Sequence, residues 1–145
     1  PAVVVVEGYN VRFMTPENLA GVTGVAERPE VVTGDLSFIS LLHVLPAVAA
    51  TAAPGADVVL LIKPQFEAGR TAVKGGLVTD PAVRADAVAG VLWAAWDVGL
   101  RTAGLIASPI AGTHGNQEYV AWLSSRRGSD PSEWTSTVTR LTGSR

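Results

Sequence analysis

The segment from Asp57 to Lys63 constrains the fold of this 145-residue chain more than any other. Its central residues, Val-Val-Leu-Leu-Ile, are all apolar, and Pro64 follows Lys63 directly. A short, continuous apolar run is typical of a strand buried on both faces, as in parallel sheets covered by helices. Proline lacks the N–H that a sheet interior needs, so the strand stops there. We therefore predict an α/β domain in which Lys63 lies at the carboxyl end of this strand, where its charge can leave the core.

Other short runs of β-branched and apolar residues, bounded by Gly, Pro or polar residues, indicate further strands. We predict them at residues 3–6, 30–33, 102–107 and 118–123. The run at 3–6 consists of consecutive valines and predicts a second strand that is buried on both faces.

Helix signals separate the early strands. Thr15 is a predicted N-cap, with Pro16 at the first helical position. A second helix is expected over residues 41–53, with Pro46 in a first turn or at a kink.

The clearest helix runs from Asp80-Pro81 to Gly99, with apolar residues on one face at helical spacing. Before it, residues 65–79 are expected to form a long, glycine-containing loop. Alternating strands and helices predict a mostly parallel sheet with right-handed crossovers. The last strand differs, because the loop at 109–115 is too short for a crossover, so residues 118–123 are predicted to run antiparallel to residues 102–107.

Composition excludes several classes of protein. The chain has no cysteine, which excludes disulfide frameworks, iron–sulfur clusters and cysteine-based zinc sites. Its apolar runs are shorter than the roughly 20 residues that cross a bilayer, so no membrane partner is expected. The 11 basic residues are scattered and the net charge is −2, unlike an autonomous nucleic-acid binder. We expect a cytoplasmic protein.

Three charged residues are predicted to meet at one sheet edge, where open α/β sheets bind their ligands. Asp35 and Lys63 follow or end two consecutive strands, and Glu118 begins the antiparallel one. A partly buried lysine between carboxylates can polarise or deprotonate a substrate hydroxyl. Taken singly, each residue has a simpler structural explanation. Asp35 could be a turn or helix-cap residue, Lys63 the end of a strand, and Glu118 an exposed edge residue. Together they favour a functional site.

Other polar residues are weaker candidates. His43 is expected to be a packed or half-exposed helix residue, whereas His114, in a glycine-rich loop, suits contact with a substrate. Two isolated histidines do not make a metal site, and we predict none. Arg70 and Lys74 suit an anionic ligand, although their loop lacks the phosphate-loop pattern.

Two further features are read as structural. Trp93 and Trp96 are expected to be packing residues of the long helix rather than a stacking platform. Ser37 lacks the flanking glycines of a nucleophile elbow.

Four ordered motifs resemble the TlyA family, whose hemolysin-like members look like FtsJ-type, S-adenosylmethionine-dependent ribosomal RNA 2′-O-methyltransferases. The motifs are Asp35-Leu36-Ser37-Phe38-Ile39-Ser40, Lys63-Pro64-Gln65-Phe66-Glu67-x-Gly69, Gly75-Gly76-x-Val78-x-Asp80-Pro81, and Ser108-Pro109-x-x-Gly112-x-x-Gly115-Asn116-x-Glu118-Tyr119. The resemblance implies a Rossmann-like methyltransferase fold, present in part over residues 1–124. Residues 125–145 are predicted to be a polar tail with a short helix that opens at Asp130-Pro131.

The resemblance also implies a chemistry. The last three members of the family's Lys-Asp-Lys-Glu tetrad fall on Asp35, Lys63 and Glu118, which makes these the expected catalytic residues. Lys63 would deprotonate or orient a ribose 2′-hydroxyl, and the two acids would fix its amine. Asn10, Asp35, Leu36 and Ser37 are the expected contacts of the cofactor, S-adenosylmethionine. The expected partner is ribosomal RNA or a ribosomal subunit.

The chain also departs from the family. The glycine-rich cofactor loop, the first lysine of the tetrad and a small RNA-binding domain would all precede Pro1. The resemblance therefore implies the carboxyl-terminal part of a methyltransferase, which by itself binds the cofactor weakly and does not turn over. Two alternatives stay open: a membrane-active hemolysin, and a non-catalytic binding module that pairs with a second copy through an exposed sheet edge.

Overall fold

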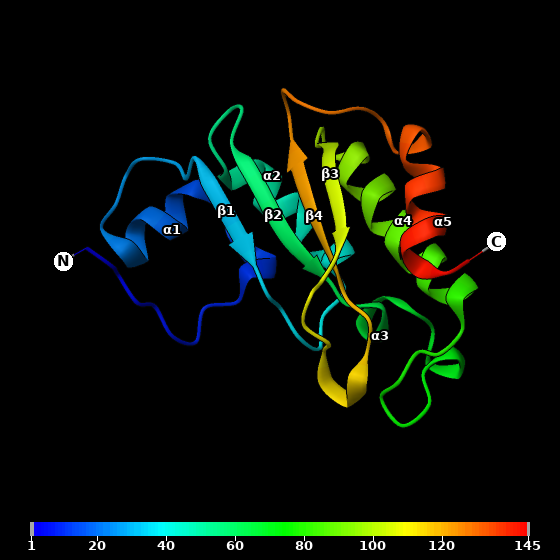
Figure 1. Cartoon of the computed structure of the whole chain (residues 1–145). Coiled ribbons are helices and arrows are strands. Elements are labelled where there is room, and N and C mark those ends of the chain that lie inside the picture. Colours follow the sequence, from blue (N-terminus) through cyan, green and yellow to red (C-terminus); the bar gives the residue numbers. More distant parts are fainter. Residues whose placement is uncertain (1, 145) are drawn as a thin grey trace.

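The computed structural model describes residues 2–144 and contains one four-stranded sheet with helices packed on it (Figure 1). The strands are β1 (Val31–Gly34), β2 (Asp57–Ile62), β3 (Arg101–Ala107) and β4 (Tyr119–Ser124). Their spatial order is β1-β2-β4-β3. These elements confirm the predicted α/β class and place four of the five predicted strands.

The last strand lies inside the sheet. β1 pairs with β2 in parallel, whereas β4 is antiparallel to both β2 and β3. The short loop therefore does reverse the chain, as predicted, and the returning strand fills the gap between β2 and β3. Ile62 and Ala107 both pair with Tyr119, so the residues next to them share one sheet edge.

Five helices accompany the sheet: α1 (Pro16–Thr23), α2 (Leu45–Thr51), α3 (Pro64–Glu67), α4 (Pro81–Asp97) and α5 (Thr135–Thr142). The predicted helix starts are confirmed where capping chemistry defines them. Thr15 accepts a hydrogen bond from the Asn18 N–H, and Asp80 accepts one from the Ala82 N–H. Pro46 lies in the first turn of α2, which follows a short 3-10 helix at Leu41–His43.

The core lies between one face of the sheet and helices α2 and α4. Alternate residues of β2, Val58, Leu60 and Ile62, are buried with apolar residues of both helices. Val59 and Leu61 point the other way and are only partly buried. The buried face of α4 matches its predicted apolar stripe, and α5 packs against α4 and β3.

Two sequence predictions about local structure are wrong. The valines at 3–6 form no strand, and Val3 and Val5 are exposed. This segment runs outside the sheet beyond β1 (Figure 1), without the neighbouring strands that would hydrogen-bond it. Within the predicted loop at 65–79, Pro64 opens the short helix α3, because its fixed φ angle suits the first position of a helix.

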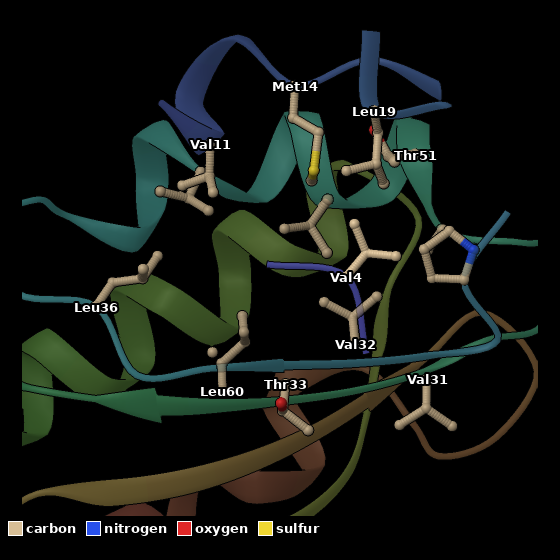
Figure 2. A pocket seen from close by; sticks show the side chains of 15 residues that line it. Val4, Val11, Met14, Leu19, Val31, Val32, Thr33, Leu36, Thr51 and Leu60 are labelled. Carbon is tan, nitrogen blue, oxygen red and sulfur yellow. The ribbon is translucent and has the colours of Figure 1, made fainter. Parts of the chain in front are cut away.

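An apolar cavity of about 590 Å³ separates the amino-terminal segment from β1 and α2. Val4, Val32 and Leu36 all line this space (Figure 2). The valine run therefore contributes one side chain to a cavity wall rather than a strand to the sheet.

Candidate active site at the carboxyl edge of the sheet

The structure brings Asp35, Lys63 and Glu118 to one cavity of about 350 Å³. Asp35 follows β1, Lys63 follows β2 and Glu118 precedes β4, so each side chain leaves the same sheet edge. The loop from Ser108 to Thr113 forms the opposite wall. The three residues thus lie at the sheet edge that strand order predicted.

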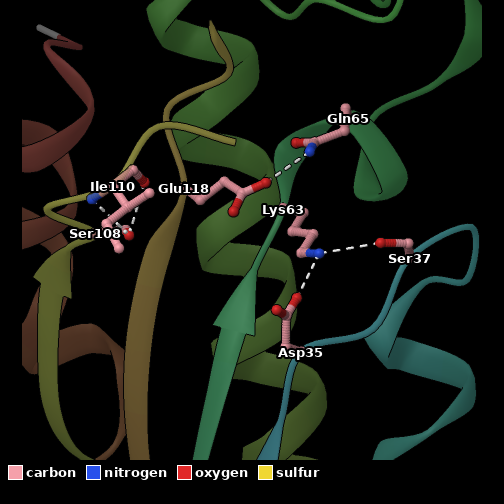
Figure 3. A network of polar contacts seen from close by, with 7 residues as sticks. All are labelled: Asp35, Ser37, Lys63, Gln65, Ser108, Ile110 and Glu118. Atoms are coloured by element: carbon pink, nitrogen blue, oxygen red, sulfur yellow. Dashed lines mark hydrogen bonds and ion pairs between the residues drawn. The ribbon is translucent and has the colours of Figure 1, made fainter. Parts of the chain in front are cut away.

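Lys63 is held by the loop that follows β1. Its Nζ lies 2.5 Å from Asp35 Oδ1 and donates a hydrogen bond to Ser37 Oγ at 3.1 Å (Figure 3). The Lys63 side chain is only 12% exposed, whereas that of Asp35 is 72% exposed. The amine is therefore positioned inside the cavity by a carboxylate that itself faces solvent.

Glu118 is held differently. Its side chain is buried, and its Oε2 accepts a hydrogen bond of 2.8 Å from Gln65 Nε2 (Figure 3). A Cβ atom at Gly112 would lie 2.0 Å from the same oxygen, so a larger residue there would displace the Glu118 carboxylate. Among the described residues, Lys63 forms its ion pair with Asp35 and not with Glu118. The expectation that both acids bind the amine is met by Asp35 alone in this structure.

A third carboxylate, Glu67, connects the loop after β1 to α3. Its two oxygens accept hydrogen bonds from Ser40 Oγ at 2.5 Å and from the Leu41 N–H at 2.7 Å. Burial raises the pKa of Glu67, and the two hydrogen bonds partly oppose that rise. Glu67 thereby attaches the loop after β1, which contains Asp35 and Ser37, to helix α3, which begins directly after Lys63.

Phe38 stands out at the rim of the site. Its φ angle is 63°, its side chain is 91% exposed, and its ring centroid lies 5.1 Å from that of Phe66. A positive φ is costly for an aromatic residue, so the conformation requires support from its surroundings. The sequence analysis quoted Phe38 within a motif but gave it no role, because solvent exposure is not readable from residue type.

Asn116 was also missed as an organising residue. It is buried, and its side chain bonds the Val78 N–H at 3.0 Å, the Gly76 carbonyl at 2.6 Å and the Thr113 carbonyl at 2.8 Å. It therefore joins the loop before α4 to the loop before β4. His114 is exposed and packs its ring over Gly76, at the same junction.

The remaining candidates lie elsewhere. Trp93 and Trp96 are exposed, so their expected packing role is wrong; they lie beside the buried face of α4 rather than on it. His43 is exposed in its short helix. Arg70 and Lys74 are exposed on the segment before α4.

The expected cofactor contacts fall into two groups. Asp35 and Ser37 bind the Lys63 amine through an ion pair and a hydrogen bond. Leu36, in contrast, lines the apolar cavity that Val11 also lines (Figure 2). Asn10 precedes Val11, and its side chain accepts a hydrogen bond from the Arg12 N–H. The site and the apolar cavity are therefore adjacent through residues 35–37.

A charged cavity at the carboxyl edge of an α/β sheet is in the usual position of a ligand site. Residues 1–125 match the FtsJ-like methyltransferase family. The chain belongs to this family. It is 47% identical over 124 residues to "16S/23S rRNA (cytidine-2′-O)-methyltransferase TlyA" of Mycobacterium tuberculosis, an alignment that covers 85% of this chain and 44% of the relative. The predicted resemblance to TlyA is confirmed.

Two further comparisons agree. The Bacillus subtilis "Putative rRNA methyltransferase YqxC" is 42% identical over 122 residues, which cover 83% of this chain and 42% of that protein. The solved structure of a "Putative hemolysin from Streptococcus thermophilus" superposes with a TM-score of 0.82 at 33% identity, covering 93% of this chain and 47% of the other. The chain thus spans less than half the length of these relatives. No helix within residues 2–144 is long and apolar enough to cross a membrane.

Proposed function

We propose that the edge formed by Asp35, Lys63 and Glu118 methylates a ribose 2′-hydroxyl of ribosomal RNA with S-adenosylmethionine. The observation that carries this proposal is the Lys63 amine, fixed 2.5 Å from Asp35 in a cavity that Glu118 also lines. Methylation of ribose oxygens is the activity that the name of TlyA states. A positioned amine next to carboxylates suits the activation of a hydroxyl.

The chain's own residues prepare the acceptor hydroxyl. Lys63 Nζ orients the acceptor hydroxyl and assists its deprotonation, while Asp35 and Ser37 fix the nitrogen in place. Bound S-adenosylmethionine supplies a methyl group that is already activated by its positive sulfur. Most of the rate enhancement then comes from orientation rather than from strong acid–base catalysis.

The proposed cofactor contacts are Asn10, Asp35, Leu36 and Ser37. An adenine ring needs apolar walls and a polar group at its edge. Leu36 lines an apolar cavity, and Asn10 carries an amide next to another lining residue, Val11. These residues fit the nucleoside part of the cofactor.

The proposed partner is ribosomal RNA within a ribosomal subunit, which places the reaction in the cytoplasm. The exposed Phe38 ring at the rim suits stacking on an unpaired base. The net charge of −2 implies that other parts of a complete enzyme supply most of the grip on phosphates. We assign residues 1–124 to part of the methyltransferase domain and residues 125–145 to a carboxyl-terminal extension.

The test is transfer of a labelled methyl group from S-adenosylmethionine to ribosomal subunits by the natural protein that carries this chain. We expect the label in RNA and in a form that blocks alkaline cleavage of the neighbouring phosphodiester, because that cleavage needs a free 2′-hydroxyl. Label in the bases, or no label, would contradict the proposal. Release of dye from liposomes measures the membrane activity that hemolysin names imply, and we expect none.

A further inference from the structure

We propose that Gln65 is a positioning residue, which holds the Glu118 carboxylate in a closed niche and leaves one of its oxygens free for a substrate hydroxyl. The chemical consequence rests on the proposed function, whereas the positioning itself does not. Gln65 lies in the first turn of α3, two residues after Lys63.

The niche encloses one carboxylate oxygen. Glu118 Oε2 receives the Gln65 amide at 2.8 Å and abuts Gly112, where a Cβ would lie 2.0 Å away (Figure 3). The whole Glu118 residue is only 5% exposed. Because both the amide and the glycine backbone meet the same oxygen, Glu118 has one defined orientation.

The other oxygen is left for a ligand. Within residues 2–144, the Gln65 amide is the only donor to the Glu118 carboxylate. A buried carboxylate with one neutral donor is short of partners, and burial of an undercompensated charge is unfavourable. The cavity that Glu118 shares with Lys63 gives room for a further donor. A ribose hydroxyl has the chemistry of that donor.

The orientation of Gln65 is itself determined by Glu118. The Gln65 Oε1 atom is buried and has no partner among the described residues. An orphaned buried acceptor is unfavourable, so the side chain adopts this orientation because its Nε2 bond to a carboxylate compensates. Since α3 begins at Pro64, directly after Lys63, Gln65 also couples the position of Glu118 to that of the amine.

The experiment compares Gln65→Leu with Gln117→Leu, a matched control. Gln117 donates to the Glu118 backbone carbonyl at 3.3 Å and does not touch the carboxylate. In methyl transfer to ribosomal subunits, we expect Gln65→Leu to lower kcat by about 100-fold, because misplacement by about 1 Å has that effect. The KM for S-adenosylmethionine should stay unchanged, since the Gln65 side chain bonds Glu118 and none of the proposed cofactor contacts. Equal kcat values for the two variants would overturn the positioning role.

Two further readouts keep the result independent of folding and of the proposed function. Gln65→Glu places two carboxylates in one niche, so its rate relative to that of wild type should rise at low pH, where the two share a proton. A pH profile parallel to wild type would contradict the proposal. Crystal structures of wild type and Gln65→Leu test the geometry alone. If the Glu118 carboxylate leaves its niche only in the variant, Gln65 positions it even if no RNA is methylated. If the carboxylate stays in place, the inference fails.

Discussion

The two sides of the candidate site hold their carboxylates in opposite ways. Asp35 is largely exposed, lies on a loop and pairs with the charged end of Lys63. Glu118 is buried at the start of a strand and is held by a neutral amide from α3. The first side can adjust to a ligand by rotating a solvated side chain, whereas the second is fixed by its enclosure.

This difference assigns different tasks to the two acids. Because the Asp35 carboxylate is exposed, solvent screens its ion pair with Lys63, which should contribute about 0–1 kcal/mol to stability. Asp35 therefore serves mainly to orient the amine. A buried carboxylate with a neutral donor is held at a cost to stability, which is the pattern of a functional group rather than a structural one. Neutralising either acid should therefore lower activity, whereas the effects on stability should differ between the two sides.

The largest effect is expected from Gly112→Ala, which places a methyl group against Glu118 Oε2. We expect about a 100-fold loss of methyl transfer, because the carboxylate must leave its niche, and destabilisation of about 1–3 kcal/mol from overpacking. Gly69→Ala is the control, because nothing lies within 4 Å of a Cβ at that position. Equal activity of the two variants in the labelled-methyl assay would show that the niche does not matter.

Glu118→Gln and Asp35→Asn contrast the two sides directly. Both should lower methyl transfer, by about 10- to 100-fold, through loss of a positioned charge. Urea unfolding should separate them. Glu118→Gln is expected to leave the free energy of unfolding unchanged or raise it by about 1 kcal/mol, since a buried charge is removed. Asp35→Asn should lower it by less than about 1 kcal/mol. The reverse order of stabilities would refute the assignment of tasks.

Glu67 gives a pH-dependent test of the connection between the loop and α3. Its pKa is raised above the ordinary value of 4.5 by burial, so the folded state favours the protonated form. This contribution to stability is present below the ordinary pKa and is lost as the pH rises through the raised pKa. Relative to Glu67→Gln, wild type should lose stability over that interval. Parallel unfolding curves of the two proteins from acid to neutral pH would contradict the prediction.

The smallest effect is expected from Ser37→Ala, which removes the 3.1 Å hydrogen bond to Lys63 and leaves the Asp35 contact intact. One hydrogen bond is worth about 0.5–1.5 kcal/mol, so methyl transfer should fall about 2- to 10-fold. Steady-state rates at saturating cofactor measure this change. If Ser37→Ala lowered methyl transfer as much as Asp35→Asn does, the Asp35 contact would not be the stronger of the two contacts to the Lys63 amine, and the prediction would be wrong.

Two valine-rich segments show how far sequence patterns predict this fold. Residues 3–6 and Asp57–Ile62 carry the same signal, yet only the second is a strand. A strand needs at least one neighbour to complete its backbone hydrogen bonds, and β2 has β1 and β4 whereas the first segment has none. Helix starts were predictable because Thr15 and Asp80 act locally as caps.

The candidate site was predictable where strand ends define it. Asp35, Lys63 and Glu118 could be placed at one edge from strand order alone, since parallel ends and an antiparallel start coincide. Their contacts could not, because the Gln65–Glu118 bond joins residues 53 positions apart through side chains that leave no periodic pattern. The buried role of Asn116 depends likewise on two loops meeting in space.

The measurement that tests the central claim most directly is nucleoside analysis of ribosomal RNA after reaction with deuterated-methyl S-adenosylmethionine, for wild type and Lys63→Ala. The account predicts a deuterated 2′-O-methyl nucleoside with wild type and a loss of at least about 100-fold with Lys63→Ala, at an unchanged unfolding midpoint. A labelled base in place of a labelled ribose, or equal 2′-O-methylation by the two proteins, would contradict it.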